Sequence, residues 1–213
     1  MPTCLPSGTR HTNTVNDRPE AIRLRVHGGP EAFAYEDAPT PDPGEGEVIV
    51  AVHAAAVTPT ELDWVPTWTT PAGAKRSFPI IPGHEFSGVV HRVGPGVTDL
   101  AEGDAVFGMN DWFRDGAQAE YCVARAADLA LKPRSVDHVL AALTPISALT
   151  AWQGLFERAH LAVGERVLIH GAAGGVGIFA VQLARHHGAH VIATASAHNH
   201  EFVRGLGATE VID

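Results

Sequence analysis

A glycine-rich segment, His170-Gly-Ala-Ala-Gly-Gly-Val-Gly177, has the residue types and spacing of a phosphate-binding turn. It follows a short apolar run that predicts a strand and precedes a run that predicts a helix, the context that such a turn requires. In the pattern G-x-G-x-x-G, Ala172 takes the first position and Gly174 and Gly177 take the others. Gly174 lets backbone approach a pyrophosphate, the amides of Gly175 and Val176 would face the anion, and Gly177 allows close helix–strand packing. The loop therefore predicts that the protein binds a dinucleotide.

The segment 192–200 distinguishes between the two nicotinamide dinucleotides. About 20 residues beyond the loop, NAD-binding folds place an acidic residue that accepts the ribose 2′-hydroxyl. This segment contains no Asp or Glu, Ser196 can donate a hydrogen bond to a 2′-phosphate, and His198 or His200 can add positive charge. We therefore expect NADPH rather than NADH. The cofactor-binding residues expected in the loop and the segment are Ala173, Gly174, Gly175, Val176, Gly177, Thr194 and Ser196.

Cysteine and histidine usage argues against a metal centre. Cys4 and Cys122 are the only cysteines, which excludes a disulfide framework and a cysteine-rich zinc site. Several of the 13 histidines fall between residues 186 and 200, at a predicted helix end or in a loop. Histidines at such places are usually solvated or cap a helix. We expect no metal there.

The glycine loop belongs to an alternating pattern of strands and helices. The predicted elements are a strand over 166–170, a helix over 176–187, a strand over 190–194, a helix over 199–206 and a strand over 210–212. This β-α-β-α-β order is the first half of a doubly wound Rossmann sheet. Upstream, an Ala- and Leu-rich stretch over 135–160 predicts two helices that Pro145 separates.

The first half of the chain has short strand patterns separated by Gly, Pro and Asp turns. The predicted strands cover 21–27, 47–57, 86–93, 105–107 and 119–124. Strands at this spacing indicate a small β-barrel or a sandwich. Residues 1–20 are mostly polar and aperiodic, and we expect a flexible tail there. The predicted fold class is therefore α/β.

The strand over 166–170 has an unusual place in this plan. In the strand order 3-2-1-4-5-6 it lies in the middle of the sheet, so a sheet of only the three predicted strands leaves it as an apolar edge. Such an edge favours aggregation. We expect the chain to be a C-terminally truncated part of a longer protein. The alternative is a naturally short protein that pairs this edge with a second chain.

Composition excludes several classes of protein. The chain has 213 residues, with 15 basic and 24 acidic side chains, for a net charge of −9. Such an acidic chain is a poor nucleic-acid binder. No apolar run reaches the roughly 18 residues of a membrane helix, and the first ten residues lack the apolar core of a signal peptide. We expect a cytoplasmic protein that binds neither nucleic acid nor membrane.

Five further segments, taken with the loop, resemble the medium-chain dehydrogenase/reductase superfamily, and its zinc-independent, zeta-crystallin-like NADPH quinone oxidoreductase branch in particular. They are Gly44–His53, Ile81–Gly88, Gly103–Gly108, Ala148–Trp152 and Leu206–Asp213. The resemblance runs from about residue 21 to 213. It implies a GroES-like β-barrel catalytic domain over 21–146, followed by an incomplete NADP-binding Rossmann domain over 147–213. It also implies a homodimer when the protein is full length.

Zinc-dependent members of the superfamily resemble the chain at Pro82-Gly-His-Glu85, where His84 would be a metal ligand. They also need cysteines at positions that Thr58 and Ile146 occupy here, and a catalytic zinc needs three protein ligands. We therefore expect that no zinc is bound and that His84 is a hydrogen-bonded residue at the domain junction.

The implied reaction is hydride transfer from NADPH to a quinone or an α,β-unsaturated carbonyl, because conjugation spreads the negative charge that forms. By resemblance, Thr150 lies against the nicotinamide and Thr58 lines the same cleft, while Thr60 or Asp63 orients the carbonyl or passes a proton. Aromatic walls for a flat acceptor are expected from Trp64, Trp68, Phe107 and Trp112. The alternatives are a zinc-type alcohol dehydrogenase and a non-catalytic, truncated cofactor-binding chain.

Overall fold

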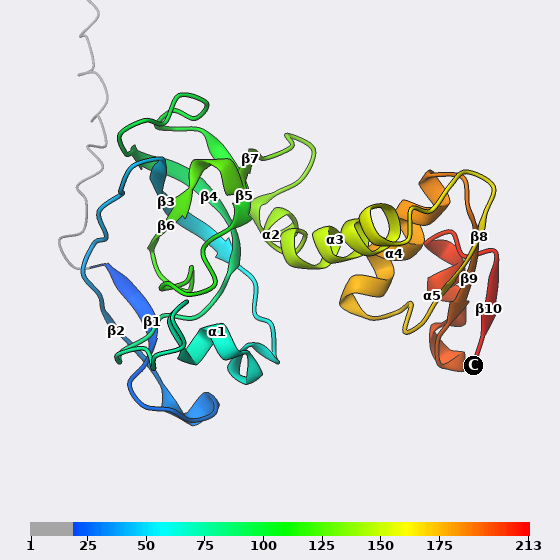
Figure 1. Ribbon diagram of the computed structural model, residues 1–213, viewed down its shortest axis with the longest axis horizontal. Coiled ribbons are helices and arrows are strands. Elements are labelled where there is room, and N and C mark those ends of the chain that lie inside the picture. The colour runs from blue at the N-terminus through cyan, green and yellow to red at the C-terminus, as the bar shows by residue number, and fades with distance from the viewer. Residues whose placement is uncertain (1–18) are drawn as a thin grey trace, which may run out of the picture.

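The computed structural model describes residues 19–213, which form a β-rich part and an α/β part joined by helices (Figure 1). In the β-rich part a five-stranded antiparallel sheet has the order β6-β3-β4-β5-β7. Its strands are β3 (Glu47–Ala55), β4 (Glu85–Val93), β5 (Ala105–Met109), β6 (Tyr121–Arg125) and β7 (Leu129–Leu131). The core of this part lies on one face of the sheet and includes Val48, Val50, Phe86, Val90 and Val106.

Shorter elements surround this sheet. Strands β1 (Glu20–Leu24) and β2 (Phe33–Asp37) form a separate antiparallel pair. Helix α1 (Val65–Trp68) follows the 3₁₀ turn η2 (Glu61–Asp63), and three more 3₁₀ turns are η1 (Pro30–Ala32), η3 (Ala126–Asp128) and η5 (Ala197–Asn199). The strand pattern at 21–27 correctly predicted β1, whereas β2 and β7 were not predicted. The tail predicted for residues 1–20 lies, up to residue 18, outside the described residues.

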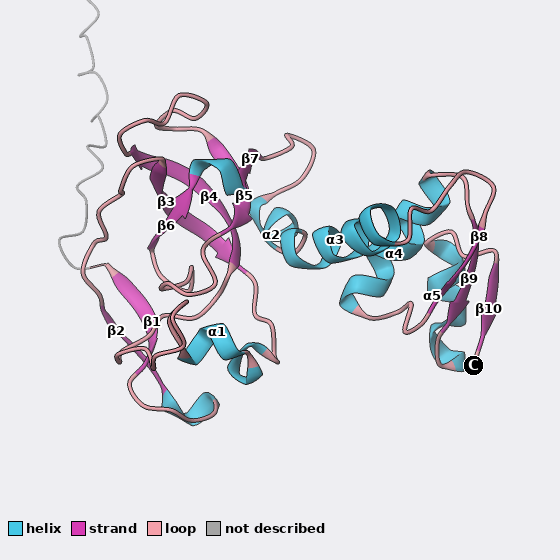
Figure 2. Cartoon of the chain, in the orientation of Figure 1, coloured by secondary structure: helices cyan, strands magenta, loops and turns pink. Residues whose placement is uncertain are grey.

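Helices connect the two parts (Figure 2). Helix α2 (His138–Ala142) begins at Asp137, whose carboxylate accepts a hydrogen bond from the Leu140 amide. Helix α3 (Pro145–Trp152) begins at the proline and continues into a π-helical segment, η4 (Gln153–Arg158). Proline favours the first turn of a helix because its missing N–H has no partner to lose there. The predicted separation of two helices at Pro145 is confirmed.

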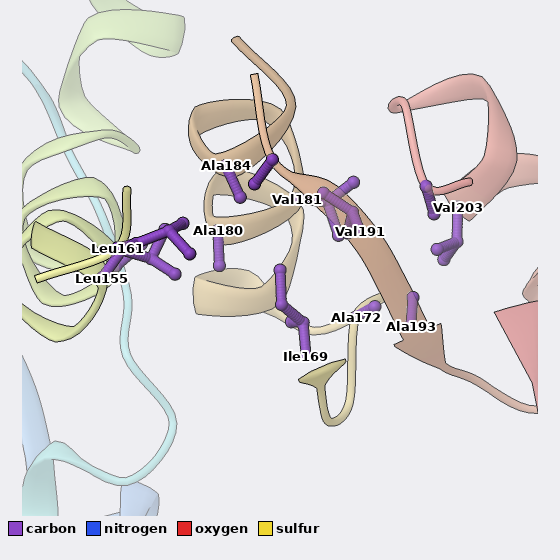
Figure 3. Packing of buried hydrophobic residues seen from close by; sticks show 13 residues of the cluster. Leu155, Leu161, Ile169, Ala172, Ala180, Val181, Ala184, Val191, Ala193 and Val203 are labelled. Atoms are coloured by element: carbon purple, nitrogen blue, oxygen red, sulfur yellow. The ribbon is translucent and has the colours of Figure 1, made fainter. Parts of the chain in front are cut away.

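The second part is a β-α-β-α-β unit, as predicted. It consists of β8 (Arg166–Ile169), α4 (Gly175–His186), β9 (His190–Thr194), α5 (His200–Gly205) and β10 (Glu210–Ile212). The strands are parallel, in the order β10-β9-β8. Figure 3 shows the core of this part, where Val181 and Ala184 of α4 pack near Val191 of β9.

Strand β8 lies at the edge of this sheet and pairs within the described residues only with β9. Its Leu168 is 50% exposed. The prediction of an apolar edge strand before the glycine loop is confirmed. No helix in the described part of the chain is long and apolar enough to cross a bilayer.

Candidate cofactor and acceptor site

The glycine loop connects the end of β8 to the start of α4. Gly171 has a φ of 62°, a backbone conformation that favours glycine. Gly174 caps α4, and the first α-helical hydrogen bond runs from the Ile178 amide to the Gly174 carbonyl at 3.0 Å. The amides of Gly175 and Val176 therefore precede the helical hydrogen bonding and lie at the positive end of the helix dipole. This is the donor set that a pyrophosphate needs.

Gly177 is required by close packing. A Cβ at this position would lie 2.3 Å from the Gly171 carbonyl oxygen and 2.7 Å from the Ala172 Cα. Thr194 at the end of β9 holds the other side of the loop. Its hydroxyl accepts a hydrogen bond from the Gly171 amide at 3.1 Å, and its carbonyl accepts one from the Ala172 amide at 3.0 Å. The loop is thus preorganised, as a cofactor cradle must be.

A cavity of about 720 Å³ lies at the junction of the two parts, and we call it the junction cavity. Its wall includes Thr58 and Glu85 from the β-rich part, Thr144 and Ser147 from the start of α3, and Gly175 from the glycine loop. Thr58, expected in the catalytic cleft, and Gly175, expected to bind the cofactor, therefore line the same cavity. They are 117 positions apart in the sequence (175 − 58).

The other predicted site residues lie around the junction cavity or away from it. Ala173, Gly174, Val176 and Gly177 belong to the loop that contributes Gly175. The Thr150 hydroxyl donates to the Ile146 carbonyl at 2.6 Å, and Thr150 does not line the cavity. Thr60 and Asp63 are exposed at the turn η2, outside the lining of the junction cavity. Ser196 caps the 3₁₀ turn η5. Their functional roles stay predictions.

A second cavity, of about 790 Å³, borders the first, and we call it the aromatic cavity. Both cavities share Phe107 and Thr144 as wall residues. The aromatic cavity is also lined by Trp112, Phe113, Leu149 and Asn110. Of the aromatic walls expected from the sequence, Phe107 and Trp112 line this cavity, and Trp64 packs on Trp112 with ring centroids 5.2 Å apart. Trp68 packs instead against His27, at 4.2 Å.

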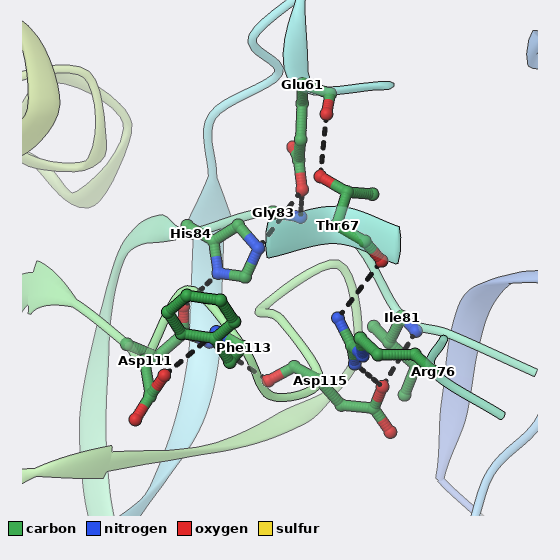
Figure 4. A network of polar contacts seen from close by, with 10 residues as sticks. Glu61, Thr67, Arg76, Ile81, Gly83, His84, Asp111, Phe113 and Asp115 are labelled. Carbon is green, nitrogen blue, oxygen red and sulfur yellow. Dashed lines mark hydrogen bonds and ion pairs between the residues drawn. The ribbon is translucent and has the colours of Figure 1, made fainter. Parts of the chain in front are cut away.

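A buried polar chain ends at Asn110 in the lining of the aromatic cavity, and Figure 4 shows its Glu61, Gly83 and His84. Glu61 Oε1 accepts a hydrogen bond from the Gly83 amide at 2.8 Å and lies 3.4 Å from His84 Nε2. His84 Nδ1 lies 3.0 Å from Asn110 Oδ1. Glu61, His84 and Asn110 are 4%, 2% and 3% exposed, so these side chains are shielded from bulk solvent. Glu61 and Asn110 carried no sequence signal, because neither belongs to a pattern with a recognised spacing.

Burial sets the protonation of these groups. It raises the pKa of Glu61, although the Gly83 amide opposes that shift, and it lowers the pKa of His84. Burial likewise raises the pKa of Glu85, whose carboxylate accepts a hydrogen bond from the Ile146 amide at 2.8 Å. Both shifts favour the neutral forms of these side chains, the imidazole of His84 and the carboxylic acid of Glu61.

The residues at the zinc position do not fit a metal. Both ring nitrogens of His84 face side chains of this chain, Asn110 and Glu61, and Glu85 is bound to the Ile146 amide. Thr58 and Ile146 occupy the positions where cysteines would be needed. Among residues 19–213, His, Cys, Asp and Glu nowhere gather in a group of three that could hold a metal ion.

Comparison with known proteins agrees with this fold. Residues 44–134 match the alcohol dehydrogenase GroES-like domain. A chloroplastic quinone-oxidoreductase homolog from Spinacia oleracea is 38% identical over 192 residues, which cover 87% of this chain and 58% of that protein. The structure of the quinone oxidoreductase from Coxiella burnetii has a TM-score of 0.82 at 32% identity, covering 92% of this chain and 62% of that chain.

A solved NAD-dependent alcohol dehydrogenase is similar to the same degree, with a TM-score of 0.82 at 33% identity over 91% of this chain and 63% of that one. The chain spans about 58% of the length of curated quinone oxidoreductase relatives from spinach and rat.

Proposed function

We propose that this chain, which belongs to the medium-chain dehydrogenase/reductase superfamily, is part of an NADPH-dependent oxidoreductase. The enzyme reduces a quinone or an α,β-unsaturated carbonyl without a metal. The junction cavity carries this proposal, because it brings the glycine loop and the Thr58 turn to one space. Relatives named as quinone oxidoreductases support the acceptor class.

The glycine loop fits a dinucleotide. The free amides at the start of α4 would bind the pyrophosphate. Gly177 packs so closely on Gly171 that a side chain at position 177 would not fit, which keeps the cradle open. When bound, the nicotinamide supplies the hydride. The protein contributes orientation and exclusion of water, since the junction cavity is lined largely by apolar side chains such as Val57, Leu143 and Phe179.

The preference for NADPH rests on the segment after β9. The residues of this segment include no carboxylate, Asp213 Oδ1 lies 3.5 Å from the ring of His200, and Ser196 and His198 are exposed. His200 donates to the Ala195 carbonyl at 2.8 Å and so holds the segment in place. We expect Ser196 and His198 to donate hydrogen bonds to the 2′-phosphate of NADPH.

The contacts of His84 support metal-free reduction. A zinc ion at this position would have to displace His84 from Asn110 or Glu61, and the two carboxyl groups nearby, those of Glu61 and Glu85, each accept a hydrogen bond from a backbone amide. An alcohol dehydrogenase of the zinc type would need three protein ligands. Prolonged dialysis against a strong zinc chelator should therefore leave quinone reduction unchanged, and a loss of activity that zinc restores would contradict this proposal.

The cofactor proposal is tested by titrating the chain with NADPH and with NADH. Trp152 is half exposed on α3, and energy transfer from tryptophan to the reduced nicotinamide reports binding. We expect saturable binding with NADPH at least 10-fold tighter, an energy difference of about 1.4 kcal/mol. Equal affinities, or tighter NADH, would contradict the assignment.

A matched pair of glycine substitutions locates the cofactor. Gly177→Ala forces a Cβ to within 2.3 Å of the Gly171 carbonyl and should abolish NADPH binding. Gly205→Ala places its Cβ in open space on α5 and should leave binding unchanged. If both variants bind NADPH like the parent chain, the glycine loop is not the cofactor site.

A further inference from the structure

We propose that the aromatic cavity holds the carbonyl acceptor and that the Asn110 side-chain amide donates a hydrogen bond to the acceptor's carbonyl oxygen. This inference rests on the proposed function, since it names the group that recognises the acceptor of that reaction. Asn110 is thereby a substrate-contacting residue. Glu61 and His84 act through it, as positioning residues.

The walls of the aromatic cavity suit a flat conjugated ring. Phe107, Trp112 and Phe113 offer aromatic surface, and Leu149 adds an aliphatic wall from α3. Conjugated rings gain from stacked or edge contacts with such side chains beyond simple burial. A volume of about 790 Å³ is within the range of small-molecule sites, which combine apolar walls with few polar groups. Three charged residues line this cavity: Arg125 and Asp128, which bond each other at 2.6 Å, and Asp111, whose Oδ1 accepts a hydrogen bond from the Phe113 amide at 2.8 Å.

Asn110 has one amide hydrogen to spare. Its Nδ2 carries two hydrogens, and within residues 19–213 its one hydrogen-bond acceptor is the Asp115 carbonyl, at 3.3 Å. The residue is 3% exposed, and it lines the aromatic cavity. Nδ2 thus has a partner for one of its two hydrogens, and a buried amide gains from a partner for the second. The oxygen of a carbonyl acceptor in this cavity would satisfy that hydrogen.

The orientation of the amide is fixed from both ends. Asn110 Oδ1 faces His84 Nδ1 at 3.0 Å, and Nδ2 faces the Asp115 carbonyl. Reversing the amide would place two oxygens, Oδ1 and the Asp115 carbonyl, against each other. His84 is held in turn by Glu61 at Nε2 and by the Trp112 ring, whose centroid lies 5.3 Å from its own. The polar chain therefore presents the Nδ2 donor in one direction.

A fixed donor at this place favours reduction. Negative charge gathers on the acceptor's carbonyl oxygen as the hydride arrives, and a preorganised N–H in a dry site stabilises that charge more than the neutral ground state. Asn110 donates a hydrogen bond and gives up no proton, so the proton that completes the product comes from water. The aromatic cavity shares Phe107 and Thr144 with the junction cavity, which places the acceptor beside the proposed nicotinamide site.

The test compares a quinone with its parent hydrocarbon in the absence of cofactor. Equilibrium dialysis measures the affinity of the chain for duroquinone and for durene, which lacks the two oxygens. Duroquinone has no free ring position for a thiol to attack, so Cys122 does not interfere. We expect duroquinone to bind roughly 10-fold more tightly than durene, the value of one hydrogen bond from a buried donor.

Two substitutions of Asn110 distinguish a contribution of its amide to ligand binding from a contribution to folding. Asn110→Asp keeps an oxygen for His84 Nδ1 and replaces the Nδ2 donor with an oxygen that faces the Asp115 carbonyl, and it should abolish the preference for duroquinone over durene. Asn110→Leu removes the amide oxygen and the amide nitrogen while keeping a side chain of similar volume. A folded Asn110→Leu variant should also lose the preference for duroquinone. Asn199→Asp, the same chemical change in the segment after β9, is the control and should bind both ligands like the parent chain.

Two results would overturn the inference: equal affinities of the parent chain for duroquinone and durene, or a preference for duroquinone that survives in Asn110→Asp. Turnover with NADPH is scored separately. Quinone binding that depends on Asn110 without any turnover would contradict the proposed function and support this site. Turnover without such dependence would support the function and refute the site.

Discussion

At the scale of single residues, the buried Glu61–His84 pair is the most unusual feature of the site. His84 Nδ1 faces Asn110 Oδ1, an oxygen that can only accept, so the proton of a neutral His84 lies on Nδ1. His84 Nε2 then meets Glu61 Oε1 at 3.4 Å, and one proton must lie between them to avoid two opposed lone pairs. Burial raises the pKa of Glu61 and lowers that of His84, and both shifts favour this proton on the carboxyl group rather than on the imidazole.

The raised pKa of Glu61 predicts a pH-dependent stability. A carboxyl group with a raised folded-state pKa stabilises the fold fully below its ordinary value of 4.5, and this contribution is lost as the pH rises through the folded value. Glu61→Gln stays neutral throughout. Its free energy of unfolding, relative to the parent chain, should therefore rise between pH 4 and pH 7, as measured by urea denaturation. Glu102→Gln, at an exposed position, is the control. A difference that is constant with pH would refute the prediction.

At the scale of elements, the short helix α2 links the sheet to the site. It packs on β3 and β4, and its Leu140 and Ala141, with the adjoining Leu143, line the junction cavity. A five-residue helix is marginally stable on its own, because the conformational entropy lost in nucleation exceeds the free energy gained from the hydrogen bonds of one turn. Its start depends on Asp137, whose Oδ1 accepts from the Leu140 amide at 2.8 Å.

Asp137→Ala removes this cap and should lower the free energy of unfolding by about 1 kcal/mol. Asp137→Ser retains a capping oxygen and should cost much less. Because α2 forms one wall of the junction cavity, we also expect weaker NADPH binding in Asp137→Ala than in Asp137→Ser. Urea unfolding and the fluorescence titration measure the two effects. Equal stabilities of the two variants would show that the cap contributes nothing to the fold.

At the scale of the whole molecule, the open edge of the parallel sheet governs behaviour in solution. Strand β8 pairs with β9 alone among the described strands, and Leu168 is half exposed on it. An unpaired strand with apolar side chains is a template for pairing with another chain. The net charge of −9 opposes association over longer distances, but it is screened within about 8 Å at physiological salt.

We therefore expect the chain to self-associate with rising concentration. Leu168→Lys places a charge on the edge strand and should shift sedimentation profiles toward the monomer. Val163→Lys introduces the same charge at an exposed position just before β8 and serves as the control. A parent chain that remains monomeric at all concentrations, or a Val163→Lys variant that behaves like Leu168→Lys, would contradict an association through β8.

The sequence by itself determined the features that depend on neighbouring residues. Alternating and helical patterns located the β-α-β-α-β unit almost to the residue, because period and turn residues are local properties. The glycine loop and the edge position of β8 followed from spacing and from the strand order of such sheets. β2 was not predicted because none of its side chains is fully buried, so it has no apolar face that packs on a core, and β7 was not predicted because it spans only Leu129–Leu131.

Only the tertiary structure decided which of the chemically capable residues meet. It brought Thr58 and Gly175 to one cavity and placed Thr60 and Asp63 at an exposed turn outside it. It also assembled Glu61, His84 and Asn110, which come from a turn, the approach to β4 and the end of β5. Burial and pairing across such distances depend on how strands register and helices pack. Those contacts leave no periodic trace in the sequence, so the polar chain that ends at Asn110 could be found only in the folded molecule.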